Sequence, residues 1–153
     1  MTDARALTGR IAPDQYLARF GGQRATDKFS PLAVRDLGDY LRVRTDPSDR
    51  VLIFGFSADA YVRAQRLSAS RFFWSRPIIA GFNEGVPGYG VAGLLAELRA
   101  AKPRAVVLQR HDWPAERSDS IGYFMSSRDL SEWLRSEYQV DRETSMYQIW
   151  LRR

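Results

Sequence analysis

Three short apolar runs along the chain have the pattern of buried strands. Residues 51–56, VLIFGF, are rich in Val, Ile and Phe and follow the turn signal Asp-Pro-Ser-Asp at 46–49, which predicts a strand buried on both faces. Residues 71–74 predict a second strand, and residues 105–108 predict a third of the same buried kind. We expect the first of these to be the central strand of the sheet.

Helical patterns separate the strands. Ser57 is expected to cap a helix over residues 58–65, and residues 91–98 place apolar side chains on one helical face before Lys102-Pro103 ends that helix. Strands that alternate with helices of this length call for parallel pairing and right-handed crossovers. The chain is therefore predicted to be an α/β protein of three layers, α/β/α, with a mostly parallel sheet.

A helical lead-in is predicted over residues 1–45. A short amphipathic helix begins at Pro13 and is expected to stop at Gly21-Gly22, and a longer helix follows the signal Ser30-Pro31. The longer helix carries an apolar stripe, so it is expected to pack on the sheet.

The end of the chain predicts one more helix and a hairpin. Ser126 and Asp129 match a capping box at the start of the helix, and strand-like runs follow at residues 138–142 and 146–151. The loop between these runs is short, and such a loop joins antiparallel neighbours. A C-terminal antiparallel hairpin is therefore expected at the sheet edge.

Composition favours a single folded domain over residues 1–153, with the α/β core at 46–153. The chain is 44% hydrophobic and 27% charged, with four Trp, seven Tyr and eight Phe, which is typical of globular proteins. It has no cysteine, which excludes disulfides and thiolate metal sites. The formal net charge of +5 favours phosphates or anionic lipid surfaces as partners, although 21 arginines against 2 lysines are better explained by a GC-rich genome.

Several kinds of chemical site find weak support in the sequence. A dinucleotide-binding turn needs three glycines, whereas residues 54–60 hold only Gly55. His111-Asp112 resembles half of a catalytic triad, but the chain has neither a cysteine nor a G-x-S-x-G elbow, which favours a polar loop tip instead. One histidine and scattered acids give no metal-ligand spacing. Arginines among aromatic residues at 61–76 would suit a nucleic-acid backbone, yet solvated helix positions and core aromatics explain them better.

Residues 51–72, VLIFGFSADAYVRAQRLSASRF, join several features in one order. An apolar strand ends in Phe-Gly, Asp59 and Tyr61 follow in the next helix, and residues 66–72 have the form Arg-x-x-x-Ser-Arg-Phe. This order resembles the start of the C-terminal soluble domain of GT-C membrane glycosyltransferases, the superfamily of dolichyl-phosphate-mannose protein mannosyltransferases and bacterial lipid A aminoarabinose transferases. Residues 9–22, GRIAPDQYLARFGG, are similar to the stretch that leads into that domain.

The resemblance implies an accessory domain on the periplasmic side of the bacterial inner membrane, in an enzyme that transfers a sugar from a polyprenyl-phosphate carrier. In that superfamily the catalytic acid lies between membrane helices, so the resemblance implies no catalytic residue here, no metal, no cofactor and an inactive isolated chain. The implied partners are the transmembrane portion of the same polypeptide, upstream of Met1, and a lipid-linked sugar or the membrane surface, without nucleic acid. The chain has no apolar run of the roughly 20 residues that span a membrane, so the resemblance implies that it is part of a larger multi-spanning protein whose membrane helices lie upstream.

Two other functions are also compatible with the sequence. One is a stand-alone Rossmann-like protein that binds a nucleotide or a sugar at the carboxyl edge of the sheet, and the other, less favoured, is a basic nucleic-acid-binding module. A nucleic-acid module would bind phosphates with an affinity that falls steeply with salt.

A ligand-binding or membrane-facing surface is expected where the strands' carboxyl ends meet two long irregular segments, residues 77–89 and 109–123. Open α/β sheets bind ligands outside that edge. Arg71 is the candidate phosphate contact, since a guanidinium is always charged and offers a planar fork of donors. The candidate substrate-binding residues are Ser57, Asp59, Tyr61, Arg71, Arg110, His111 and Trp113.

Overall fold

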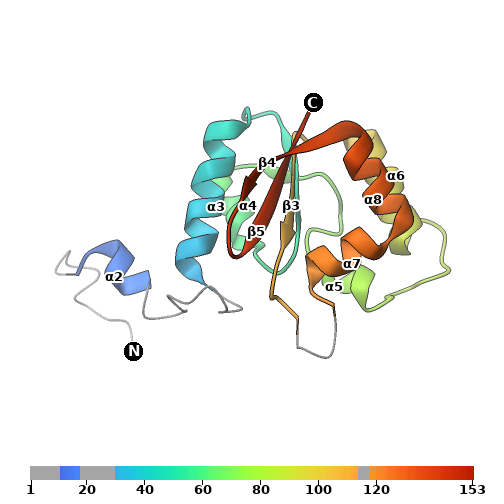
Figure 1. Cartoon of the computed structure of the whole chain (residues 1–153), viewed down its shortest axis with the longest axis horizontal. Helices are drawn as coiled ribbons and strands as arrows, with labels where there is room; N and C mark the ends of the chain where they lie inside the picture. Colours follow the sequence, from blue (N-terminus) through green and yellow to red (C-terminus); the bar gives the residue numbers. More distant parts are fainter. Residues whose placement is uncertain (1–10, 18–29, 114–117) are drawn as a thin grey trace.

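The computed structural model describes residues 11–17, 30–113 and 118–153 and has an α/β fold (Figure 1). Its five strands form one sheet in the order β2-β1-β3-β5-β4. The strands are β1 (Arg50–Phe54), β2 (Leu67–Ser68), β3 (Ala105–Gln109), β4 (Tyr138–Glu143) and β5 (Tyr147–Arg152).

The sheet is mixed, so the prediction of a mostly parallel sheet is wrong. β1 pairs in parallel with β2 and with β3, whereas β5 pairs antiparallel with both β3 and β4. The predicted C-terminal hairpin is confirmed, and it inserts β5 directly beside β3. β3 is consequently the central strand, and the expectation that residues 51–56 hold that place is wrong, because the hairpin extends the sheet on the far side of β3.

The predicted second strand at residues 71–74 is also wrong. β2 lies earlier, where Leu67 and Ser68 pair with the first two residues of β1. The Ser68 hydroxyl then donates to the Ser70 carbonyl at 2.6 Å and accepts from the Ser70 N–H at 3.2 Å, while Nη1 of Arg50 donates to the Ser68 carbonyl at 2.8 Å. These backbone groups are bonded to side chains, so the ladder ends there.

The helices are α2 (Pro13–Leu17), α3 (Pro31–Arg44), α4 (Asp59–Ala64), α5 (Arg76–Ile79), α6 (Gly90–Ala101), α7 (Ser120–Ser126) and α8 (Arg128–Glu137). α3 begins as predicted, with the Ser30 hydroxyl accepting from the Ala33 N–H at 3.2 Å. The expected capping box before α8 does not form, because the Ser126 hydroxyl donates to the carbonyl of Tyr123. α5 and α7 overlap the segments 77–89 and 109–123, which were predicted to be irregular, and the expected helix end at residues 21–22 lies outside the described residues.

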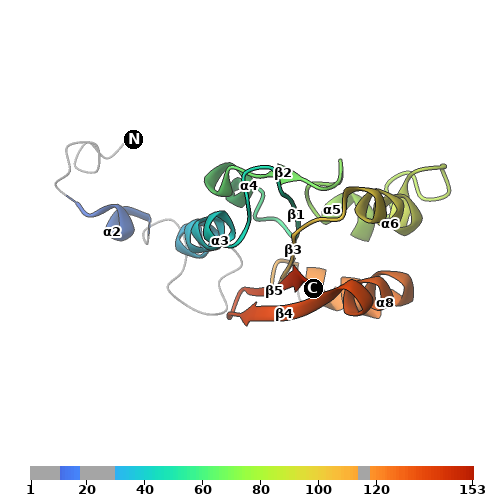
Figure 2. The same ribbon diagram turned by 90° about the horizontal axis from the view of Figure 1, so that it is seen from above.

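Alternate residues of β1 and β3 belong to two separate hydrophobic clusters. Leu52 and Val106 pack with residues of α6, α7 and α8, whereas Ile53 and Val107 pack with residues of α3 and α4. Figure 2 shows α3 and α4 on one side of these strands and α6 and α8 on the other. The predicted burial of the first and third strands is confirmed, since every residue of the two except Arg50 is buried.

Arg66 joins the ends of two helices from within the core. It is 7% exposed, and its guanidinium donates to the Thr45 hydroxyl at 2.8 Å and to four carbonyls, those of Arg42, Thr45, Ala64 and Gln65. These carbonyls lie at the carboxyl-terminal ends of α3 and α4, where helix dipoles favour a positive charge. Among the described residues Arg66 forms no ion pair with a carboxylate, so the acceptors around its charge are neutral oxygens, those of the four carbonyls and of the Thr45 hydroxyl.

Candidate functional site

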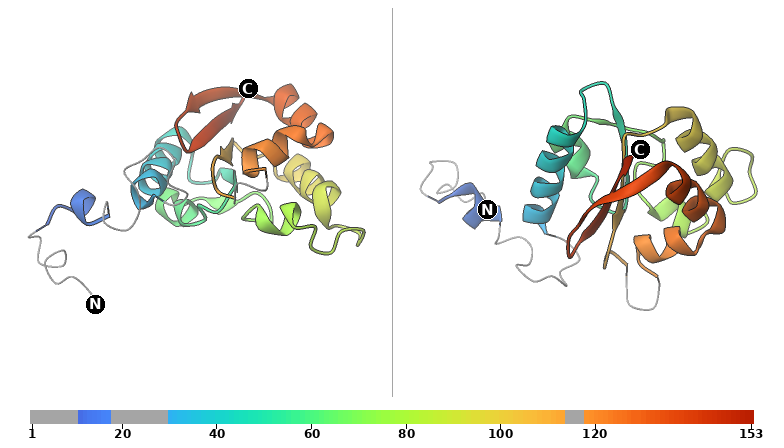
Figure 3. Two further views of the ribbon diagram at one scale, coloured as in Figure 1. Left: turned by 60° about the horizontal axis from the view of Figure 1, so that its bottom comes forward. Right: turned by 45° about the horizontal axis from the view of Figure 1, so that its top comes forward.

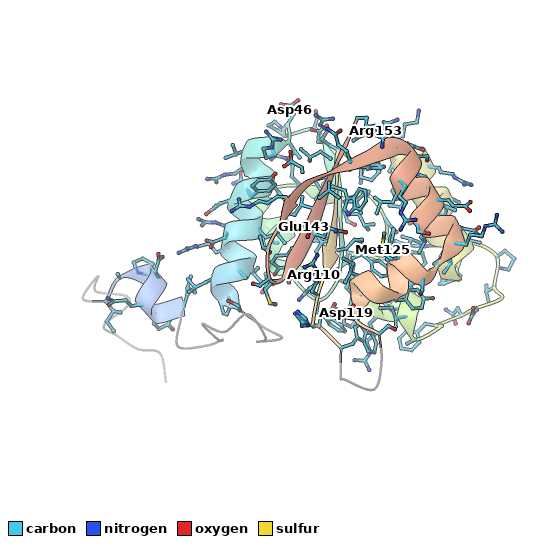
Figure 4. The ribbon with its side chains drawn as sticks, in the orientation of Figure 1. Asp46, Arg110, Asp119, Met125, Glu143 and Arg153 are labelled. Carbon is cyan, nitrogen blue, oxygen red and sulfur yellow. The ribbon has the colours of Figure 1, made fainter. Side chains whose placement is uncertain are left out.

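The carboxyl ends of β1 and β3 meet α5 and α7 at one end of the molecule (Figures 1 and 3). Arg110 and Asp119 lie at this end, whereas Asp46 and Arg153 lie at the opposite end of the sheet (Figure 4). Ser75, just before α5, donates its backbone N–H to the Gly55 carbonyl at 3.1 Å, which ties α5 to the end of β1. This carboxyl end is the edge at which the sequence predicts a site.

Ser57 is a buried link between three strands at this end. Its hydroxyl lies 2.7 Å from the Tyr147 hydroxyl of β5 and 2.9 Å from Oε1 of Gln109 in β3. The same Oε1 accepts the backbone N–H groups of Phe56 and Ser57 at 2.7 and 3.0 Å. Gly55 permits this approach, because a Cβ at that position would lie 2.4 Å from Oε1. The prediction that Ser57 caps α4 is therefore wrong, since its hydroxyl is engaged by β3 and β5.

The Tyr147 hydroxyl is held in its neutral form. The pKa of Tyr147 is raised to about 12, chiefly by burial; the hydrogen bond with Ser57 opposes this rise, and the charge of Asp112 adds a smaller contribution in the same direction as burial. A phenol with such a pKa stays protonated at neutral pH. Tyr147 is thus a hydrogen-bonding group that orders the site, without the properties of a general base.

A second buried polar group lies beneath the loop after β3. Asp112 accepts the Ser120 N–H at 2.9 Å and the Ser120 hydroxyl at 2.6 Å, and that hydroxyl lies 2.7 Å from the hydroxyl of Ser75. Burial is the main cause that raises the pKa of Asp112, and its hydrogen bonds with Ser120 oppose the rise. Both serines are fully buried, so their hydroxyls connect α5, α7 and the loop and do not face solvent.

His111 and Arg110 border the buried groups from the solvent side. The His111 side chain is exposed, its backbone has φ of 58°, and its N–H donates to Oδ2 of Asp119 at 3.0 Å. Asp112 binds Ser120, so it does not orient the imidazole in the way that a triad carboxylate does. Arg110 forms an ion pair with Glu143 of β4 at 3.2 Å.

Four aromatic side chains gather at the carboxyl end and are named here the aromatic cluster: Phe56, Phe73, Trp74 and Trp113. The Phe56 ring packs edge-on against Trp74 at 5.7 Å and against Trp113 at 5.5 Å between ring centroids. Phe73 stacks on Trp74 at 6.2 Å and is 49% exposed. The cluster unites three segments that lie far apart in the sequence and brings aromatic area to the surface.

Asp59 lies at the rim of a cavity of about 340 Å³ beside the start of α3. Ser57, Arg35 and Arg63 also line this cavity. Arg63 is paired with Asp39 at 2.7 Å, and Arg35 is paired with acidic neighbours in α2 and α3, so both cations are neutralised. The exposed carboxylate of Asp59 forms no hydrogen bond or ion pair with the described residues. A cavity with one free carboxylate and an apolar wall suits a small polar molecule better than an anion.

Tyr61 belongs to α4, and its side chain lies away from this end, against β1 and β2. Its hydroxyl accepts the Ile53 N–H at 2.8 Å and lies 3.3 Å from the Ser68 hydroxyl. Tyr61 is buried, and burial is the main cause that raises its pKa. Its geometry ties α4 to β1 and β2.

Arg71 lies beside α6 and not with the other candidate residues. Its Nε pairs with Glu97 at 2.8 Å, its Nη2 donates to the Gly88 carbonyl, and its guanidinium lies 5.1 Å from the Phe72 ring centroid and 4.8 Å from that of Tyr89. The side chain thereby fastens the loop before α6 to the helix. Its half-exposed guanidinium leaves Nη1 without a bond to any described residue.

The structure thus brings Ser57, Arg110, His111 and Trp113 to one end, places Asp59 at its margin, and separates Tyr61 and Arg71 from them. The residues that sequence reasoning missed are Gln109, Tyr147, Ser75 and Ser120. Gln109 carried a usable signal, since it is the polar last residue of an otherwise apolar strand. Tyr147 carried none, because it reaches the site through antiparallel pairing with β3.

Over the described ranges, 11–17, 30–113 and 118–153, no group of three His, Asp or Glu side chains is placed to hold a metal ion. In the same ranges no helix has the length and apolar character needed to cross a membrane. Comparison with known proteins gives no match to a family model, to a curated protein or to a solved structure. Function is therefore inferred from the geometry of the site and from the sequence resemblance of residues 51–72.

Proposed function

We propose that the chain is a non-catalytic, extracytoplasmic domain of a GT-C-type membrane glycosyltransferase that transfers a sugar from a polyprenyl-phosphate donor. In this proposal the domain is a three-layer α/β/α unit on the periplasmic side of the bacterial inner membrane. Its partners are the transmembrane portion of the same polypeptide and the lipid-linked sugar or membrane surface.

The observation that carries the proposal is that residues within 51–72, the segment that resembles the GT-C soluble domain, form hydrogen bonds with one another. Tyr61, from the helical part of the pattern, binds the backbone of Ile53 in the strand and the hydroxyl of Ser68 in the segment that follows. Arg66, which opens that segment, holds the ends of α3 and α4. A pattern whose members form one bonded unit is better explained by a shared domain than by chance.

Two further features support an accessory role within a three-layer unit. The groups with raised pKa values at the carboxyl end, Asp112 and Tyr147, are buried and bonded to serines, so they are poorly placed to exchange protons with a substrate. Separate hydrophobic clusters pack against the two faces of the sheet, as a central sheet between two helical layers requires.

The proposal is tested with the natural gene product in membranes, including the sequence encoded upstream of Met1. We expect several apolar runs of about 20 residues upstream and transfer of a labelled sugar from a polyprenyl-phosphate donor. Arg71→Ala is expected to reduce transfer by roughly tenfold or more, because a charge-assisted contact with phosphate contributes roughly 1.5–3 kcal/mol.

Glu97→Gln is the matched control for Arg71→Ala. It weakens the ion pair that holds Arg71 but keeps the guanidinium, so transfer is expected to persist while the two variants lose similar stability. Equal losses of transfer in both variants would assign Arg71 to the fold alone. An upstream sequence without membrane spans, or membranes inactive with every polyprenyl-phosphate sugar tried, would contradict the proposed function.

The cavity beside Asp59 favours one alternative, a stand-alone protein that binds a sugar or a nucleotide. Its volume of about 340 Å³ is within the range of small-molecule sites. Calorimetric titration of the isolated chain with free sugars and nucleotides tests this alternative. Saturable binding that Asp59→Ala abolishes would favour it, and heats no larger than those of dilution would remove it.

A further inference from the structure

A cavity of about 200 Å³ lies between α3 and the hairpin of β4 and β5, whose turn lies beside that helix (Figures 1 and 2). Its floor consists of apolar side chains of the core, since Leu37, Met146 and Ile149 are 3%, 4% and 2% exposed. Its mouth carries two exposed charged side chains, those of Asp36 and Arg142. The cavity is therefore apolar inside and charged at its opening.

Arg142 is a cation without an acidic partner at this mouth. Its guanidinium lies 5.1 Å from the centroid of the Tyr40 ring, and it forms no hydrogen bond or ion pair within the part of the chain that the structure describes. The acids on either side of it in β4, Asp141 and Glu143, pair with other arginines. The planar fork of donors on Arg142 is therefore available to a carboxylate.

Asp36 supplies a negative charge on the α3 side of the mouth. It lies four residues before Tyr40 in the helix, so the two side chains share a face. Arg35 donates both of its bonds to Oδ1 of Asp36, at 3.0 and 2.8 Å, which leaves Oδ2 without a bond to any described residue. Arg35 also pairs with Asp14, so one positive charge is shared by two carboxylates and the three side chains together stay negative.

We propose that this cavity binds a free amino acid with an apolar side chain. Arg142 binds the α-carboxylate, Oδ2 of Asp36 binds the α-ammonium group, and the side chain of the ligand enters the apolar floor. Asp36 and Arg142 are the two charged residues of the lining, so this ligand uses both. A simple anion would meet the carboxylate of Asp36 and a simple cation would meet Arg142, whereas a zwitterion matches the two charges at once.

The size of the cavity agrees with such a ligand. Sites for drug-sized molecules have volumes of about 300–1,000 Å³. A cavity of about 200 Å³ is smaller and equals the volume of roughly seven water molecules at about 30 Å³ each. This space accepts an amino acid with a side chain of a few carbon atoms and is too small for a nucleotide.

Calorimetric titration of the 153-residue chain with L-leucine tests the proposal. We expect saturable binding with a dissociation constant of about 1 mM or tighter. Two analogues separate the charges, since 4-methylpentanoate lacks the ammonium group of leucine and 3-methylbutylamine lacks its carboxylate. Each analogue is expected to bind roughly tenfold more weakly than leucine, because one charged group of the protein then has no partner. Glycine is expected to show at least the same loss, because it has no side chain to fill the floor.

Variants of the two charged residues assign the contacts. Arg142→Gln is expected to weaken leucine binding by roughly tenfold and to leave 3-methylbutylamine binding no weaker, because that analogue has no carboxylate. Asp36→Asn is expected to weaken leucine binding by a similar factor and to leave 4-methylpentanoate binding no weaker. Arg128→Gln on α8 and Asp39→Asn on α3 are the matched controls, since both residues lie outside the cavity, and both variants should bind leucine as the wild type does.

Circular dichroism checks that each variant retains the fold. The inference would be overturned if none of L-leucine, L-isoleucine, L-methionine and L-phenylalanine bound saturably. Binding of 4-methylpentanoate as tight as that of leucine would overturn it too, as would equal losses in the charge variants and their controls. The inference goes beyond the proposed function and does not rest on it: amino-acid binding by the chain and sugar transfer by membranes are separate measurements, and either can fail while the other succeeds.

Discussion

Replacement of Arg66 by methionine tests how the buried guanidinium joins α3 and α4. Methionine keeps most of the aliphatic volume and removes every donor, so the five acceptors that Arg66 now satisfies lose their partner. The bonds to the Thr45 hydroxyl, the Thr45 carbonyl and the Ala64 carbonyl are buried, and water cannot easily replace them. The bonds to Arg42 and Gln65 are partly exposed, so water can take them over.

The expected loss follows from the three buried acceptors. An unsatisfied buried polar group costs roughly 1–3 kcal/mol, and the low end of that range gives a loss of about 3 kcal/mol in the free energy of unfolding. For a domain of this size each kcal/mol lowers the melting temperature by about 2–4 °C, which predicts a decrease of about 6–12 °C. The melting temperature of Arg66→Lys should lie between those of the wild type and of Arg66→Met, since an ammonium offers three donors from one point and cannot span both helix ends.

Urea unfolding, followed by tryptophan fluorescence and by circular dichroism, measures this loss. Arg63→Met is the matched control on α4, because Arg63 forms its ion pair with Asp39 at the surface and its loss should barely move the midpoint. If Arg66→Met is no less stable than Arg63→Met, the guanidinium does not join the helices in the way described. A changed slope of the unfolding curve would instead indicate an altered unfolded state.

Two further predictions concern the carboxyl end and α6. The pKa of Asp112 in the folded state is raised above that of an unfolded aspartate, so ionisation of Asp112 destabilises the folded state. The Asp112→Asn variant should therefore be as stable as the wild type below about pH 4 and more stable than the wild type as the pH rises to 7. Chemical unfolding across that range checks the sign, and an Asn variant that is less stable at pH 7 would show that the ionised carboxylate is favoured by Ser120. A Cβ at position 93 would lie 2.1 Å from the Gly88 carbonyl, so Gly93→Ala should push the loop from α6 and destabilise the chain by about 1–3 kcal/mol. An unchanged melting temperature in thermal unfolding would contradict this second prediction.

The sequence predicted those helices and strands that are determined by neighbouring residues, such as a capping side chain or an apolar run. α3 begins at Ser30-Pro31 because one hydroxyl caps its first turn, and β1 follows directly from an apolar run. β2 has no such signal, since Leu67 is exposed and the strand exists only through its pairing with β1. Residues 71–74 were wrongly predicted to be a strand, because their aromatic run has the composition of a buried strand although only Phe72 belongs to the core.

The same distinction holds for the site. Ser57, Arg110, His111 and Trp113 were placed together correctly, because the carboxyl ends of adjacent parallel strands share an edge. The partners that actually hold Ser57 come from β3 and β5, and the register of an antiparallel strand is set by long-range packing. α7 was not predicted, although its start carries a local signal: Asp119 caps the helix by accepting the Gly122 N–H at 2.9 Å.

The position of β5 has a consequence for how the chain acquires its fold during synthesis. β5 is the last of the described strands to leave the ribosome, yet it pairs on one side with β3, whose residues lie 38 to 46 positions before their partners, and on the other with β4. Until residues 147–152 emerge, β3 has an open edge and the apolar side chains on both its faces are incompletely covered. Pairing of β5 with β3 is a non-local contact, and such contacts form slowly. We therefore expect the sheet to close only after synthesis of its last strand, with the open edge of β3 as the part of the nascent chain most exposed to aggregation.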